Sequence, residues 1–177
     1  MRNLLFLATA LALGGAASST LEAQGPRLGL AAGANIPTST LEETHDVGYH
    51  GAISLNMRSA TSPFGFRPEG AWYQFGGEGT IGNLRSLALT GNVTIDMPGQ
   101  GVRPYLIGGA GYYNTKVEDV DADNSLGLNA GVGLRFGMSG RTSAFLEARF
   151  HHVIDGIQRG GEDRNAQFVP ISFGLIF

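Results

Sequence analysis

The chain has 177 residues and a formal net charge of -3, and it contains no cysteine. The missing cysteines exclude disulfides, thiolate metal sites and a thiol nucleophile. The acidic balance excludes a broad basic surface for nucleic acid. Charged residues make up 15% of the chain, against about 25% in a typical soluble domain. A domain surrounded by water normally carries more charge, so we expect something other than water to cover much of its surface.

The first residues have the order of a secretory signal peptide. Arg2 supplies a positive start, residues 4–13 are apolar, and small residues follow over 14–19. This is the order of charged, apolar and small-residue regions that export signals share. The apolar run is too short to span a bilayer, which takes about 20 residues. We therefore predict a signal peptide over residues 1–23 and a single domain over residues 24–177.

From Pro26 onward, apolar residues recur with a period of two, which is typical of strands. Each alternating segment has about ten residues, the length that a tilted strand needs to cross a bilayer. The eight segments lie near 27–36, 48–58, 64–75, 84–97, 103–113, 126–136, 142–152 and 167–177.

The two faces of these segments distinguish a barrel in water from a barrel in lipid. In residues 126–136 one face carries Leu126, Leu128 and Val132, while the other carries small or polar residues such as Gly127 and Asn129. Small, uncharged side chains suit a narrow interior, so the large apolar side chains must face lipid. Lipid gives backbone groups no partners, so every strand edge must be closed by a neighbour. The predicted fold is all-β, an eight-stranded antiparallel up-and-down transmembrane β-barrel. Segment 103–113 is apolar on both faces, and its orientation stays open.

The predicted links alternate between long and short, as in outer-membrane barrels with long outer loops and tight periplasmic turns. The long links span about 37–47, 76–83, 114–125 and 153–166, and the short ones lie near 59–63, 98–102 and 137–141. The long links hold most of the acidic residues: Glu42, Glu43, Asp46, Glu78, Glu118, Asp119, Asp121, Asp123, Asp155, Glu162 and Asp163. Aromatic residues are expected at both membrane interfaces, with Tyr49, Trp72 and Tyr112 or Tyr113 at the outer one and Phe66, Phe136 and Phe177 at the inner one.

The last nine residues, VPISFGLIF, end on an aromatic residue and carry an apolar residue at every second position. Together with the stretches GFRPE at 65–69 and RPY at 103–105, this pattern resembles the small eight-stranded outer-membrane β-barrel family of Gram-negative bacteria, the OmpA/OmpX-like type. The resemblance implies location in the bacterial outer membrane, without a cofactor. It also implies that Phe173, Leu175 and Phe177 form the signal read by the barrel assembly machinery.

Five charged residues are expected to point into the barrel: Arg67, Glu69, Arg135, Glu147 and Arg149. Removing an ion from water costs several kcal/mol unless it is paired. The spacings Arg-x-Glu at 67–69 and Glu-x-Arg at 147–149 allow opposite charges to meet across the lumen. We therefore expect a structural network of ion pairs there, and a gate or a proton-linked role is the alternative.

Neither catalysis nor a metal site is expected. His151 and His152 lie near Asp155, but no nearby serine is placed as a nucleophile. Asp119, Asp121 and Asp123 copy the opening of a calcium loop, yet the twelfth position is Ala130 where a glutamate is required.

The favoured function is therefore a structural or surface-interaction role in the cell envelope. The expected partners are outer-membrane lipid, lipopolysaccharide and an extracellular ligand of the acidic loops. Two alternatives remain open: a small-solute conduit or ligand-binding barrel that uses the lumen, and a soluble periplasmic barrel that binds lipid.

Overall fold

The computed structural model describes residues 23–42, 45–59, 61–77, 82–117, 123–138, 140, 142–159 and 162–177. The predicted signal peptide falls almost entirely outside these residues. The described chain forms eight strands and one short 3-10 helix: β1 (Ala23–Thr38), η1 (Ser39–Leu41), β2 (Gly48–Ser59), β3 (Phe64–Phe75), β4 (Leu84–Asp96), β5 (Val102–Val117), β6 (Asp123–Gly137), β7 (Ser143–Arg159) and β8 (Glu162–Ile176). Over the same ranges, no helix has the length and apolar character needed to cross a membrane.

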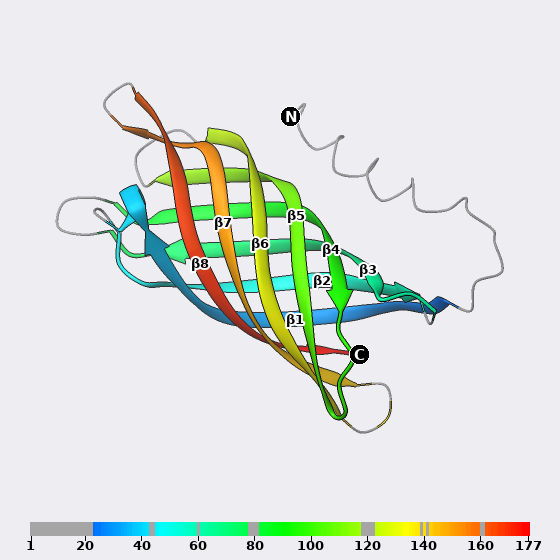
Figure 1. The fold of residues 1–177 in the computed structure, drawn as a ribbon. Helices are drawn as coiled ribbons and strands as arrows, with labels where there is room; N and C mark the ends of the chain where they lie inside the picture. The colour runs from blue at the N-terminus through cyan, green and yellow to red at the C-terminus, as the bar shows by residue number, and fades with distance from the viewer. Residues whose placement is uncertain are drawn as a thin grey trace.

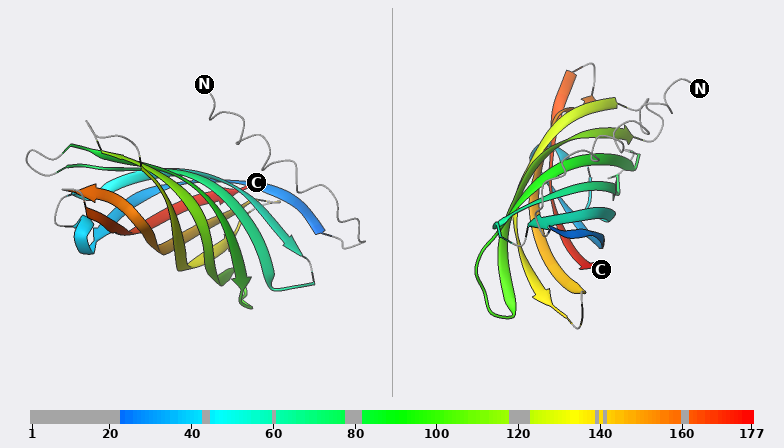
Figure 2. Two further views of the ribbon diagram at one scale, coloured as in Figure 1. Left: turned by 90° about the horizontal axis from the view of Figure 1, so that it is seen from above. Right: turned by 90° about the vertical axis from the view of Figure 1, so that its right-hand side faces the viewer.

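The strands close into a single barrel. Each strand pairs antiparallel with the next one along the chain, and β8 returns to pair with β1, where Leu30 lies opposite Leu175. Figures 1 and 2 show the tilted strands wrapping around a common axis. Closure leaves no strand edge without a partner, as an apolar environment requires. The predicted eight-stranded antiparallel fold is confirmed.

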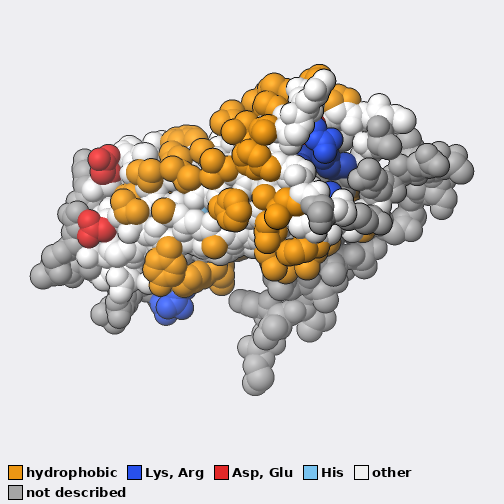
Figure 3. Space-filling view, turned by 90° about the horizontal axis from the view of Figure 1, so that it is seen from below, with side chains coloured by type: hydrophobic (Ala, Val, Ile, Leu, Met, Phe, Trp, Pro, Cys, Tyr) orange, Lys and Arg blue, Asp and Glu red, His pale blue; other side chains and the backbone are white. Residues whose placement is uncertain are grey.

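The large apolar side chains lie on the outer wall of the barrel. Leu89, Val132 and Phe173 are 52%, 57% and 58% exposed, whereas Asn92 on the opposite face of β4 is fully buried. In Figure 3 apolar side chains cover much of the wall, and charged ones gather toward its ends. A water-soluble barrel has the reverse arrangement, so the predicted orientation of the two faces is confirmed.

Strand β5, whose orientation the sequence left open, turns Tyr105, Ile107 and Tyr113 into the barrel. Leu106 and Tyr112 face outward. The inward rings fit because the neighbouring strand β6 carries glycine beside them. A Cβ at Gly133 would lie 2.2 Å from the ring of Tyr105, and a Cβ at Gly127 would lie 2.7 Å from the ring of Tyr113.

The strands extend further than their apolar patterns predicted, and the expected alternation of long and short links is wrong after β5. Only residues 160 and 161 separate β7 from β8, although a long link was expected over 153–166. Backbone pairing continues there, with Ile157 opposite Arg164 and Gln158 opposite Asp163. A hairpin that extends beyond the apolar wall needs only paired backbone groups and no apolar alternation. Five of the eleven acidic link residues, among them Glu78 and Asp119, lie outside the described residues.

Candidate functional site

The most polar part of the interior is a group of four charged side chains, called the lumen quartet: Arg67, Glu69, Glu147 and Arg149. The first two lie on β3 and the last two on β7, four strands away around the barrel. All four are buried, each with no more than 5% of its surface exposed. Alternation along each strand places both members of a pair on its inner face.

The quartet forms a closed cycle in which each carboxylate meets both arginines. Arg67 Nη2 donates to both oxygens of Glu147, at 2.7 and 2.8 Å, and Arg67 Nε lies 3.5 Å from Glu69. Arg149 Nη2 pairs with Glu69, and Arg149 Nε lies 2.9 Å from Glu147 Oε1. The four charges sum to zero, so the quartet brings no net charge into the membrane interior.

Such a cycle is costly to interrupt. An ion inside a barrel loses its water, and only its partners offset that loss. If one carboxylate were removed, the two guanidinium groups that contact it would share the other one. The arrangement therefore favours keeping β3 and β7 at a fixed separation across the lumen.

The remaining predicted charge, Arg135, lies outside the quartet. It pairs with Asp96, whose Oδ1 is 2.5 Å from Arg135 Nη1, and Asp96 also contacts Arg58. Tyr105 separates the two groups, since its hydroxyl donates to Glu147 at 2.6 Å and its ring centroid lies 4.7 Å from Arg135 Cζ. Sequence reasoning missed Asp96 and Arg58, although both have the parity of inward residues on their strands.

Above the quartet lies a cluster of rings and hydroxyls. His50 Nε2 is 2.8 Å from Ser172 Oγ, and Tyr113 Oη is 2.8 Å from His151 Nδ1. The ring of Phe168 stacks on His151, with centroids 4.9 Å apart. Tyr73 and Phe75 pack edge-on against Phe168 as well.

The contact between His50 and Ser172 joins a base to a hydroxyl, the first requirement of nucleophilic catalysis. It was not visible in the sequence because 122 positions separate the two residues. Two observations speak against a catalytic use. His50 and Ser172 are 4% and 3% exposed, and His50 Nδ1 has no hydrogen-bond partner among the described residues. Among the described residues, no carboxylate is hydrogen-bonded to His50 as the orienting group of such sites is. Within the described ranges, no group of three or more candidate ligands could hold a metal ion.

The aromatic residues expected at the interfaces lie on or near the outer wall. Tyr49 is exposed and packs edge-on against Trp72, with centroids 5.4 Å apart. Of the two tyrosines left open, Tyr112 faces outward and Tyr113 inward. At the other end, Phe66 and Phe177 are about half exposed, at 48% and 49%.

An all-antiparallel closed barrel with an apolar wall and a packed polar interior defines the class of outer-membrane β-barrels. The chain belongs to the family described as outer membrane protein beta-barrel domain, whose model matches residues 6–177. The protein is thus located in the bacterial outer membrane, and its apolar wall faces lipid. The soluble periplasmic barrel considered above is therefore wrong. No curated protein matched this sequence.

Solved structures share the fold at low sequence identity. Neisserial surface protein A superposes with a TM-score of 0.71 at 17% identity, covering 87% of this chain and 97% of its own. PagL, described as an outer membrane enzyme, has a TM-score of 0.53 at 16% identity, with 85% and 98% covered. OprG from Pseudomonas aeruginosa has a TM-score of 0.51 at 15% identity, with 86% and 94% covered. At such identities the likeness establishes the architecture alone.

Proposed function

We propose that this protein is a non-enzymatic outer-membrane barrel that acts in envelope structure or surface interaction through its extracellular end. The observation that carries the proposal is the filled lumen. The lumen quartet occupies the interior at mid-height, and the ring cluster around Phe168 lies above it. With the interior filled, the groups left for recognition are those outside the wall and beyond the strand ends.

The extracellular end supports this reading. Leu41 of η1 is 1% exposed and belongs to the same buried cluster as Phe75, Leu84 and Val153. Apolar side chains thus close the lumen on the outer side. By sequence alone, eleven of the 15 acidic residues of the chain belong to the four links expected at this end. A cationic or polyhydroxylated partner at the cell surface suits such a composition.

Conductance tests the filled lumen against the alternative of a small-solute conduit. Purified protein inserted into a planar bilayer should give no steady current above that of the bare bilayer. The double substitution Glu69→Ala with Arg149→Ala removes two long side chains from the lumen and provides the comparison. Steady single-channel steps from the unsubstituted protein would replace the proposal with the conduit.

Contact with lipopolysaccharide is proposed at one place on the outer wall. Arg85 of β4 and Lys116 of β5 lie directly opposite each other near the extracellular ends of their strands, and both are exposed. Like charges directly opposite each other on a sheet destabilise it. A phosphate group of the outer leaflet would neutralise this pair.

The lipid contact is tested in nanodiscs made with and without lipopolysaccharide. Lipopolysaccharide should raise the midpoint of thermal unfolding, and the double variant Arg85→Gln with Lys116→Gln should lose most of that rise. Arg103→Gln, an exposed arginine at the other end of the barrel, is the control. Equal rises in all three proteins would contradict the contact.

The last strand is proposed as the segment that the barrel assembly machinery reads. Phe173 and Phe177 are exposed on the outer wall, and Leu175 is partly exposed. Because Phe177 is half exposed, its loss should cost little stability. Phe177→Ala should therefore slow assembly by the purified machinery, whereas Phe66→Ala, equally exposed at the same end, should not. Equal assembly rates would contradict the assignment.

A further inference from the structure

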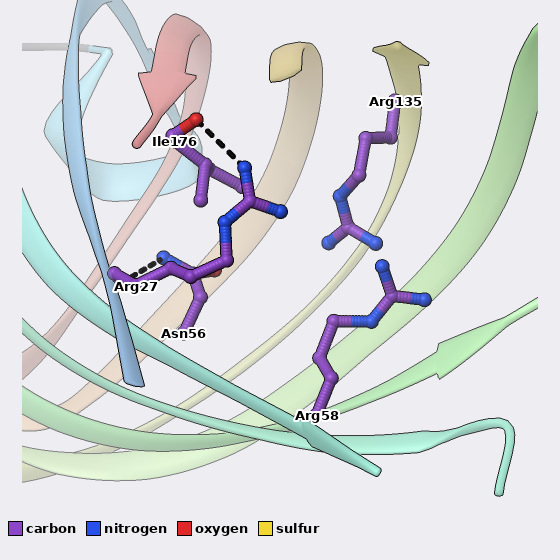
Figure 4. Close-up of a pocket in the computed structure, with 5 residues that line it drawn as sticks. All are labelled: Arg27, Asn56, Arg58, Arg135 and Ile176. Atoms are coloured by element: carbon purple, nitrogen blue, oxygen red, sulfur yellow. Dashed lines mark hydrogen bonds between the residues drawn. The ribbon is translucent and has the colours of Figure 1, made fainter. Parts of the chain in front are cut away.

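The periplasmic end of the lumen contains a small pocket lined by Arg27, Asn56, Arg58, Arg135 and Ile176. The residues come from four strands, β1, β2, β6 and β8. In Figure 4 the three guanidinium groups point toward the same space from different directions. The pocket has room for about one water-sized group, and the side chain of Arg58 in its lining is 25% exposed.

The charges around this pocket are unbalanced. Three arginines line it, and a fourth, Arg103, stands opposite Arg135 in the pairing of β5 with β6. Arg58 and Arg135 share the carboxylate of Asp96, whereas Arg27 is held at the end of β8, where its Nε donates to the carbonyl oxygen of Phe177 at 3.4 Å. Like charges held together at the edge of a low-dielectric interior repel each other strongly unless an anion accompanies them.

One donor of the pocket is also unused. Arg135 is 2% exposed, and its Nε has no hydrogen-bond partner among the described residues. A buried guanidinium N–H without a partner is costly. The Arg135 group stacks on Tyr105 and pairs with Asp96, and both contacts hold it in place.

Side chains that line the pocket are already held by hydrogen bonds. Arg27 donates to the carbonyl oxygen of Ile176 at 3.0 Å, and the side-chain amide of Asn56 donates to Ser54 Oγ at 3.1 Å. These contacts fix the pocket wall and leave its centre to the guanidinium groups. Arginine is well suited to bind oxyanions because its donors form a rigid fork.

We propose that this pocket is an anion site that binds a phosphate group from the periplasmic side. Donors that converge from three directions match a tetrahedral oxyanion better than a planar carboxylate. One phosphate oxygen enters the pocket between Arg58 and Arg135, and the rest of the group stays at the mouth. The lumen quartet closes the interior above the pocket, so the site binds its ligand without passing it through the barrel.

The test is a titration of the refolded full chain in detergent micelles with inorganic phosphate at constant ionic strength. The Nε–H signals of arginine side chains are followed by nuclear magnetic resonance. The signals of Arg58 and Arg135 should shift and saturate, while an equal amount of chloride should not produce the same shift. Vesicles containing phosphatidylglycerol form a second arm, which reports whether a lipid headgroup reaches the site.

Two variants make the result decisive. Arg58→Gln removes one charged donor and should weaken phosphate binding about tenfold or more. Asn56→Asp places a carboxylate among the arginines and should abolish binding, while its ion pairs keep the barrel folded. Gln74→Ala, at the opposite end of the barrel on β3, should bind phosphate as the unsubstituted protein does. Shifts without saturation, or equal affinity in Asn56→Asp, would overturn the proposal, and a response to vesicles alone would restrict the ligand to lipid headgroups.

Discussion

Arg67 and Glu147, 80 positions apart in the chain, meet inside the barrel with one guanidinium nitrogen within 2.8 Å of both carboxylate oxygens. The contact joins β3 to β7 across the lumen rather than along a neighbouring strand. Glu147 also accepts from Tyr105 and contacts Arg149. It is therefore the residue on which most polar contacts of the interior converge.

Glu147→Gln should destabilise the barrel by about 3–5 kcal/mol, the cost of breaking a buried pair from one side. The neutral amide leaves Arg67 and Arg149 to share Glu69. The measurement is urea-induced unfolding in micelles. Glu42→Gln, at an exposed glutamate, is the matched control and should change stability by less than about 0.5 kcal/mol.

The same experiment distinguishes pairing from simple burial. If the contact is a pair, Arg67→Gln combined with Glu147→Gln should cost clearly less than the sum of the two single changes. Additive losses would mean that the two side chains act independently.

Gly131→Ala should destabilise the barrel by about 1–3 kcal/mol through overpacking. Gly131 lies opposite Arg149 in the pairing of β6 with β7. A Cβ there would lie 2.2 Å from the carbonyl oxygen of Ala148 and 2.7 Å from Arg149 Cγ, so Arg149 would have to leave its place in the quartet. Chemical unfolding measures the loss.

Gly108→Ala provides the control for this substitution. The nearest atom to a Cβ at Gly108 is the carbonyl oxygen of Asn129, 3.7 Å away, an ordinary contact. If both glycine variants unfolded at the same urea concentration, the packing of the quartet against Gly131 would be refuted.

Val132→Arg should cost about 2–4 kcal/mol because it places a charge near the middle of the lipid-facing wall. Met138→Arg, just beyond the periplasmic end of β6, should cost at most about 1 kcal/mol. The two native side chains are equally exposed, at 57%, so a difference between the variants reports depth in the bilayer. Folding into vesicles measures it, and equal costs would argue against the membrane orientation of β6.

Ser172 should not react with a fluorophosphonate probe, although His50 lies within hydrogen-bond distance of it. Both residues are buried inside the barrel, and no carboxylate in the described part of the chain is hydrogen-bonded to His50. Mass spectrometry of the probe-treated protein measures labelling, with Ser172→Ala as the control. Labelling that depends on Ser172 would require an enzymatic function.

The sequence predicted the strands and their faces where one face is apolar and the other is small or polar. In β6, leucine and valine alternate with glycine and asparagine, and the structure follows that pattern. The same reasoning could not orient β5, because Leu106 and Ile107 are equally apolar neighbours. The orientation of β5 depends on the glycines of β6. The register between the two strands decides which β5 residues lie beside those glycines.

Register also explains what was missed in the interior. Parity indicated that Arg135 points inward, but only the pairing of strands shows that Asp96 and Arg58 reach it. In the same way, His50 and Ser172 come together only after the barrel closes. The upper part of β7 and β8 escaped prediction because its strand character depends on backbone pairing rather than on apolar alternation.

The pairing of β1 with β8 has a consequence for biogenesis. The earliest strand made by the ribosome obtains half of its main-chain partners only from the latest one. Until β8 is present, the unfinished sheet has two strand edges whose backbone groups find no hydrogen-bond partners in lipid. The polypeptide must therefore stay unfolded during export until β8 has followed β1 across the inner membrane. The pairing of β1 with β8 is then the step that closes the barrel in the outer membrane.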